Sequence, residues 1–171
     1  MLQVYSIPGR KAEFEARIVR AKAWLEHAPA SSADDYAMRL VGLAWSGADA
    51  RALRESAGAL LKLQRADGGW SANRYLNSDA YSTGRALYAL AESGSTPVND
   101  RAYRRGVDYL LSTQYPDGSW YVRSRAIKFQ PYFESGFPFG HDQWISTAGT
   151  AWAVMALARA VEPKTVSAGG N

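Results

Sequence analysis

Apolar residues recur at the spacing of an α-helix in six segments of the chain, and short stretches rich in Gly, Pro, Ser and Asp separate these segments. The pattern predicts helices over about 10–27, 34–45, 50–64, 80–92 (after a Ser78-Asp79 cap), 100–114 and 144–160. The predicted fold class is therefore all-α.

Two kinds of helix alternate along the chain. The first, third and fifth predicted helices have a charged face, whereas the second, fourth and sixth carry almost no charge beyond Arg39, Arg85 and Arg159. A helix that is apolar on nearly all sides has to be buried on nearly all sides. We therefore expect amphipathic outer helices and apolar inner helices, arranged in two layers.

The inner helices align on Leu43, Leu90 and Leu157, which lie 47 and 67 positions apart. This spacing predicts three helical hairpins in an α/α toroid or an open arc. We expect an irregular N-terminus (1–9), one repeat domain (10–162) and a flexible tail (163–171). Within the repeat domain we expect hairpins at about 10–46, 50–93 and 100–160, with a long aromatic loop at 121–143.

The pattern LLxxQxxDGxW occurs twice, ending at Trp70 and at Trp120, with the two glutamines 50 positions apart. Each copy lies where an outer helix ends. We interpret its polar and aromatic residues as structural fasteners, in which Gln donates to unpaired helix-end carbonyls, Gly takes a positive φ and Trp stacks over the amide. These residues are Gln64, Asp67, Gly68 and Trp70 in the first copy, and Gln114, Asp117, Gly118 and Trp120 in the second.

Composition removes several function classes. The net charge is +4 and the sequence pI is about 9.4, but Lys and Arg are scattered, so we expect no nucleic acid partner. With no Cys, disulfides, thiolate metal sites and Cys nucleophiles are excluded, and we expect no metal and no cofactor. No transmembrane segment and no signal peptide is apparent, so a cytoplasmic location is the default expectation.

The long loop after the second copy is the first candidate for chemistry, because loops of this length are commonly functional. Glu134 or Asp142 would act as a general acid if an apolar lid raised its pKa, and His141 lies beside Asp142. The competing interpretation is that the loop only covers the core and that Asp142 caps the sixth helix. The candidate ligand-binding aromatic residues of this region are Tyr132, Phe133, Phe137 and Trp144.

Two arginines on inner helices, Arg39 and Arg85, are candidates to bind a phosphate or carboxylate in the concavity. The alternative is that they pair with acidic residues in the first turns of neighbouring helices. The adjacent acids Asp34-Asp35 are interpreted as first-turn residues that interact with the helix dipole.

The segment from Arg105-Gly106 to Trp120 resembles the QW motif of squalene-hopene cyclases and oxidosqualene cyclases, in the prenyltransferase/squalene oxidase repeat family. The copy ending at Trp70 matches from residue 60 onward but has Glu55-Ser56 where the motif prefers a basic residue and Gly. The resemblance covers nearly the whole chain and implies an α/α toroid.

The resemblance does not bring a complete active site. Hopene-type cyclases protonate a C=C bond with a DxDD motif that does not occur here, and the zinc site of protein prenyltransferases needs a Cys that this chain lacks. If the chain is active, the resemblance implies a terpenoid-cyclase-like isomerase or lyase that binds a hydrophobic isoprenoid.

A complete toroid also needs more hairpins than the three predicted here. We therefore expect a half or C-terminal fragment of a cyclase-like toroid. The alternative is a non-catalytic repeat module that binds a protein partner, a second half-toroid or a second copy of itself.

Overall fold

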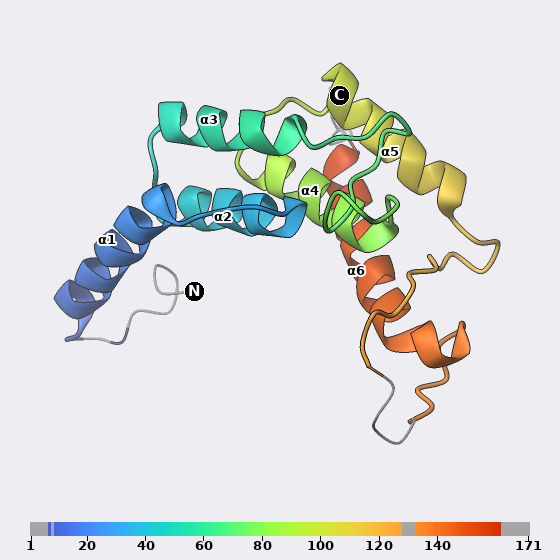
Figure 1. Cartoon of the computed structure of the whole chain (residues 1–171). Coiled ribbons are helices and arrows are strands. Elements are labelled where there is room, and N and C mark those ends of the chain that lie inside the picture. The colour runs from blue at the N-terminus through green and yellow to red at the C-terminus, as the bar shows by residue number, and fades with distance from the viewer. Residues whose placement is uncertain (1–6, 8, 128–132, 162–171) are drawn as a thin grey trace, which may run out of the picture.

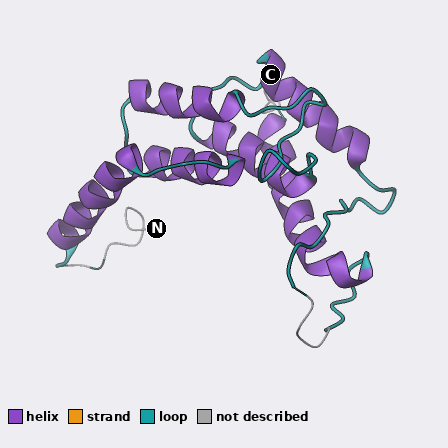
Figure 2. Cartoon of the chain, in the orientation of Figure 1, coloured by secondary structure: helices purple, strands orange, loops and turns teal. Residues whose placement is uncertain are grey.

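The computed structural model describes residues 7, 9–127 and 133–161, so most of the expected irregular N-terminus and all of the expected 163–171 tail lie outside the described residues. The described residues form helices and loops without a strand, which confirms the all-α prediction (Figure 2). The helices are α1 (Lys11–His27), α2 (Ala33–Trp45), α3 (Ala50–Leu61), α4 (Ala80–Glu92), α5 (Arg101–Thr113), a 3-10 turn η1 (Gly140–Asp142) and α6 (Gln143–Ala160).

The apolar helices α2, α4 and α6 pack side by side with α4 in the middle, while α3 lies on α2 and α5 lies on α4 (Figure 1). This is the predicted arrangement of inner and outer helices. At one end of the arc α1 contacts α2, where the Leu25 side chain packs against Gly42. No residue of α1 is fully buried, and Trp24 is exposed, so the first hairpin is much more open than its apolar spacing predicted.

Acidic and hydroxyl side chains fix the starts of the helices. Ser32 and Asp35 form a capping box at α2, in which the Ser32 hydroxyl accepts from the Asp35 amide and the Asp35 carboxylate accepts from the Ser32 amide. Asp49, Asp79 and Asp100 cap α3, α4 and α5 through their carboxylates. The Asp79 cap is the one predicted from the sequence.

Burial of the inner helices differs from the expectation. The middle helix α4 is buried over most of its surface, including Leu87 and Leu90. For α6 the expectation was wrong, because Val154, Met155 and Trp144 are exposed although the helix carries no charge before Arg159. The physical reason is position: among the described residues, α4 has an inner helix on each side, whereas α6 has one on the α4 side alone.

The two LLxxQxxDGxW joints are built alike around their tryptophans. The Trp70 indole donates to the Leu60 carbonyl (2.9 Å), and the Trp120 indole donates to the Leu110 carbonyl (2.8 Å). The backbone amide of each tryptophan donates to a threonine of the following inner helix, Thr83 on α4 or Thr150 on α6. The helix-end carbonyls are therefore paired by tryptophan, and not by glutamine as the sequence suggested.

Gln64 instead connects its own repeat to the next one. Gln64 donates to the Gly68 carbonyl within its own turn (2.8 Å) and to the Ala102 carbonyl at the start of α5 (2.7 Å). Gly68 and Gly118 have φ of +90° and +85°, as the turn requires. Asp67 and Asp117 each accept from a backbone amide two residues later, which closes both turns.

Candidate functional site at the inner helices

The inner face of the arc centres on one stripe of α4. Tyr81, Arg85, Tyr88 and Glu92 recur every three or four residues, so they share one helix face, and each is half-buried. The fully buried residues of α4, such as Leu87, lie on its other faces, and Leu87 packs against Gly106 of α5. The stripe therefore faces away from the outer layer.

An ion pair links this stripe to the first turn of α2. Arg85 Nη1 lies 3.2 Å from Asp34 Oδ2, with 13% and 28% of the two side chains exposed. Among the described residues, Asp34 Oδ1 is buried without a hydrogen-bond partner, and so is Arg85 Nε. Burial raises the pKa of the Asp34 carboxyl above its usual range, although the Arg85 charge opposes the shift.

The adjacent carboxylate shows the opposite behaviour. Asp35 is exposed and accepts from the backbone amides of Ser31 and Ser32, which lowers the pKa of its carboxyl. One helix turn thus holds two acids with pKa shifts of opposite direction. Asp35 has the structural role expected of a first-turn acid, whereas Asp34 is a partly buried acid on the inner face.

Aromatic rings surround the Arg85 guanidinium. Its carbon lies 5.1 Å from the Tyr81 ring centre and 5.6 Å from the Trp152 ring centre, and the Tyr81 hydroxyl bonds to Arg85 Nη1 (2.8 Å). Trp152 of α6 also packs edge-on against Tyr88, with centroids 5.5 Å apart. These electron-rich faces stabilise the positive charge of Arg85 and hold its guanidinium at the inner face.

At the carboxyl ends of the inner helices Glu92 joins all three. Its carboxylate accepts from the Trp45 indole of α2 (2.9 Å) and pairs with Arg159 of α6 (2.5 Å). The Arg159 guanidinium also lies 5.5 Å from the Tyr88 ring centre. Together with the Asp34–Arg85 pair, this contact holds the inner face together at both ends.

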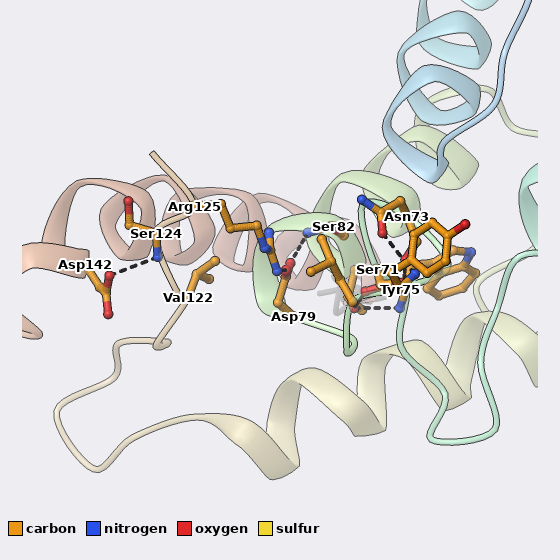
Figure 3. Close-up of polar contacts among 12 residues, drawn as sticks. Ser71, Asn73, Tyr75, Asp79, Ser82, Val122, Ser124, Arg125 and Asp142 are labelled. Atoms are coloured by element: carbon orange, nitrogen blue, oxygen red, sulfur yellow. Dashed lines mark hydrogen bonds and ion pairs between the residues drawn. The ribbon is translucent and has the colours of Figure 1, made fainter. Parts of the chain in front are cut away.

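A cleft of about 640 Å³ opens near the amino ends of α4 and α6. Its wall includes four tyrosines and the charged residues Asp79, Arg123 and Arg125. Figure 3 shows Tyr75, Asp79 and Arg125 and the polar contacts around them. The lining of the cleft is formed by residues 75–80, the α5 residues Tyr109 and Thr113, then Tyr115, and residues 120–123 with Arg125.

Two of the charged residues that line this cleft pair with each other. Asp79 Oδ2 pairs with Arg125 Nη2 at 3.1 Å, while Asp79 Oδ1 caps α4 by accepting from the Ser82 amide. Burial raises the pKa of Tyr109 to about 12, and the nearby carboxylates act in the same direction. The cleft therefore presents tyrosine hydroxyls and the Asp79–Arg125 ion pair, with Arg123 as a further charge on its wall.

The loop residues predicted for catalysis have structural contacts. Asp142 accepts from the Tyr121 hydroxyl (2.8 Å) and from the Ser124 amide (2.9 Å), and so ties the segment after the second joint to the start of α6. It does not cap α6 with its side chain, contrary to the interpretation above. Glu134 and His141 are exposed, so the described residues form no apolar lid over Glu134.

The aromatic candidates of the loop lie at the surface. Phe133 and Trp144 are exposed, and the Trp144 indole donates to the Phe133 carbonyl (3.2 Å). Phe137 is half-buried and neighbours Phe139, whose ring packs against Tyr115 and Tyr121 of the second joint. Tyr132 lies outside the described residues.

The two arginine candidates differ. Arg85 pairs with a first-turn acid of the neighbouring inner helix, which is the alternative weighed from the sequence. Arg39 instead donates to the Ala28 carbonyl (2.9 Å) and stacks near Tyr36, so its guanidinium supports the turn before α2. Asp34 lies 51 positions from Arg85, so no local sequence pattern could have identified this ion pair.

The part of the chain that the structure describes contains no group of three or more His, Cys, Asp or Glu side chains placed to hold a metal ion. Its helices also include none with the length and apolar character needed to cross a membrane.

Comparison with known proteins agrees with the repeat architecture. Residues 49–169, more than half of the chain, match the family described as the squalene-hopene cyclase C-terminal domain. A squalene-hopene cyclase from Bradyrhizobium diazoefficiens is 35% identical over 80 residues, which cover 36% of this chain. The match spans only 12% of that relative's length. The family match, the six-helix fold and the two QW-type joints together show that this chain belongs to the squalene-hopene cyclase C-terminal domain family.

Proposed function

We propose that this chain is a cyclase-like segment whose inner face contacts a polyprenyl hydrocarbon such as squalene, with Asp34 as its acid. The observation that supports this function is the environment of Asp34. A raised pKa increases the fraction of protonated carboxyl, and the buried Oδ1 is free to carry the proton.

The chemistry of such a step is consistent with the neighbours of Asp34. Transfer of the proton from Asp34 Oδ1 to an alkene carbon would leave a carbocation on the hydrocarbon and a carboxylate on Asp34. Arg85 would stabilise that carboxylate through the existing ion pair. The Tyr81 and Trp152 rings face the Arg85 guanidinium and so help to hold it beside Asp34.

The neighbouring acid provides a matched control. Incubation with squalene, followed by gas chromatography and mass spectrometry, should give a cyclised product with the unmodified chain and with Asp35→Asn. Asp34→Asn should give none, while its circular dichroism stays unchanged. Product formation by Asp34→Asn, or loss of product in both variants, would refute the role of Asp34. If squalene binds saturably but no variant converts it, the inner face is a binding surface and Asp34 is not a catalytic acid.

A second function is favoured by the exposed apolar residues at the two ends of the arc. Trp24 of α1 and Val154 and Met155 of α6 are all exposed. We propose, as the alternative, a non-catalytic repeat module that binds a protein partner or a second half-toroid through these ends. Light scattering on the purified protein tests this alternative. A strictly monomeric protein that binds no partner and converts squalene would contradict it.

A further inference from the structure

A further cleft, of about 620 Å³, opens between the start of α2 and the first joint. It is lined by residues 31–33, by Lys62, Leu63 and Arg65 just after α3, and by Ser71 and residues 73–75 after the joint. We call it the α2 cleft, and we call the cleft of about 640 Å³ described above the α4 cleft.

The internal repeat places the two clefts at equivalent positions. An offset of 47 relates the starts of α2 and α4, and an offset of 50 relates the two joints. Positions 31–33, 63, 65, 71, 73 and 75 of the α2 cleft thereby correspond to 78–80, 113, 115, 121, 123 and 125, all of which line the α4 cleft. Each cleft thus lies between the start of an inner helix and the next joint along the chain.

The two clefts differ in charge at their equivalent positions. Ser32 caps α2 where Asp79 caps α4. Tyr75 occupies the position that corresponds to Arg125, the partner of Asp79. Both members of the Asp79–Arg125 ion pair are therefore replaced by neutral residues in the α2 cleft.

Three cationic side chains lie on the wall of the α2 cleft, namely those of Lys62, Arg65 and Arg74. The described lining includes no acidic residue, and none of the three cations forms an ion pair within the described residues. The wall of the α4 cleft has two cationic residues and one acidic residue. Like charges around one concave surface raise the local positive potential, which attracts an anion.

Neighbouring groups hold two of these cations in place. Arg65 Nη1 donates to the Ser71 hydroxyl (3.2 Å) and to the Leu76 carbonyl (2.8 Å), while Arg65 Nε and Nη2 have no partner in the described part of the chain. Arg74 donates to the Tyr75 hydroxyl, and its guanidinium carbon lies 4.7 Å from the Tyr75 ring centre. A guanidinium that is already fixed loses little side-chain entropy when it binds, and its planar fork matches the oxygens of an oxyanion.

The carboxylates closest in sequence to the α2 cleft have other partners. Asp34 pairs with Arg85, and Asp35 accepts from the backbone amides that precede α2. Asp67 accepts from the Gly69 amide and from the Ser78 hydroxyl. None of the three acids is part of the described lining, so the charge of the cleft is left for an anion from outside the chain.

We propose that the α2 cleft binds a dianionic phosphate group through Lys62, Arg65 and Arg74. Two negative charges on one group interact with three cations more strongly than the single charge of a carboxylate does. Leu63 (38% exposed) and Tyr75 (79% exposed) add apolar surface to the same cleft, which favours the phosphate monoester of a small apolar or aromatic molecule over free phosphate. This binding requires neither the hydrocarbon nor the acid proposed above.

Isothermal titration calorimetry on the whole chain tests the choice of ligand. At low ionic strength and about pH 7.5, a phosphate monoester with a second pKa of about 6 is dianionic. We expect saturable binding of phenyl phosphate, weaker binding of inorganic phosphate, and binding of acetate that is at least about tenfold weaker than that of phenyl phosphate. Inorganic phosphate that binds as tightly as phenyl phosphate would support the site and identify free phosphate as its ligand. Acetate binding of equal strength, or no saturable binding of either phosphate, would overturn the proposal.

The equivalent α4 cleft provides the matched control variant. Lys62→Glu and Arg74→Glu should each weaken phenyl phosphate binding at least about tenfold. Ser32→Asp should do the same, because it introduces the cap carboxylate that the α4 cleft has, and Asp caps a helix as well as Ser does. Arg123→Glu makes the same change in net charge in the α4 cleft and should weaken binding less than about twofold, with circular dichroism unchanged in all four variants. Equal weakening by Arg123→Glu would overturn the proposal, because it would assign the binding to the overall charge of the protein.

Discussion

Gly84 offers a sharp test of how the inner helices pack. A Cβ at this position would lie 2.6 Å from the Trp152 carbonyl carbon and 2.7 Å from the Ala153 amide nitrogen. Both are backbone atoms of α6, so the clash cannot be relieved by a side-chain rotation. In Gly84→Ala, α4 and α6 would have to separate by several tenths of an ångström along their contact.

Two opposing terms set the magnitude. Replacing a mid-helix glycine by alanine gains about 0.5–1 kcal/mol of helix stability. Overpacking a tight contact costs about 1–3 kcal/mol. We therefore expect Gly84→Ala to lower the free energy of unfolding by about 1–2 kcal/mol, which is about 2–4 °C in Tm per kcal/mol for a chain of this size.

Gly58 of α3 is the matched control, because an added Cβ there meets nothing within 4 Å. Gly58→Ala should raise the free energy of unfolding by about 0.5–1 kcal/mol. Urea and thermal unfolding, followed by circular dichroism at the helix band, measure both variants. If Gly84→Ala is as stable as the unmodified chain while Gly58→Ala gains stability, the close approach of α4 and α6 is refuted.

Three further predictions concern the joints and the start of α2. Gln64→Ala removes two hydrogen bonds and should lower the free energy of unfolding by about 1–3 kcal/mol. Gln114→Ala removes one exposed hydrogen bond and should lower it by less than about 1 kcal/mol. Equal losses in urea unfolding would contradict the different surroundings of the two joints. Gly68→Ala and Gly118→Ala both force alanine to a positive φ, which should lower the free energy of unfolding by about 1–2 kcal/mol in each variant. At Gly68 the added Cβ would also lie 2.5 Å from a backbone oxygen of α5, a contact that Gly118 does not make. A smaller loss of stability in Gly68→Ala than in Gly118→Ala would therefore count against this contact. Asp35 has a lowered pKa in the folded state, so its stabilisation is present above the unfolded value of about 3.9 and is lost as the pH falls through the folded value. Asp35→Asn should therefore lower the urea midpoint at pH 7 and leave it nearly unchanged at pH 2, and an equal deficit at both pH values would exclude the carboxylate charge as the cause.

Local physical chemistry made much of the fold readable from the sequence. Apolar residues at a 3.6-residue period mark helices wherever they occur, and a carboxylate such as Asp79 caps a helix through the amides that immediately follow it. A glycine at a tight reversal, such as Gly68, takes a positive φ because it has no Cβ. The helices, their two classes and the repeat of the joints depend on neighbours within a few residues.

The partners of individual side chains could not be predicted in this way. Asp34 and Arg85 are 51 positions apart, and their pairing depends on the packing of α2 against α4. The raised pKa of Asp34 follows from that packing, so the sequence indicated only a first-turn acid. The indole partners of Trp70 and Trp120 were missed for a related reason, because several groups near a helix end compete for the same carbonyls.

The sequence alone thus determined the six helices, their inner and outer roles and the family, because spacing, capping and turn chemistry are written in short stretches. Only the tertiary structure decided which acid lies on the inner face and which apolar helix remains uncovered. Val154 and Leu87 are both apolar residues of inner helices, yet one is exposed and the other is buried. Burial is a property of the neighbours that surround a residue, and in the part of the chain that the structure describes α6 has a neighbouring inner helix on one side only.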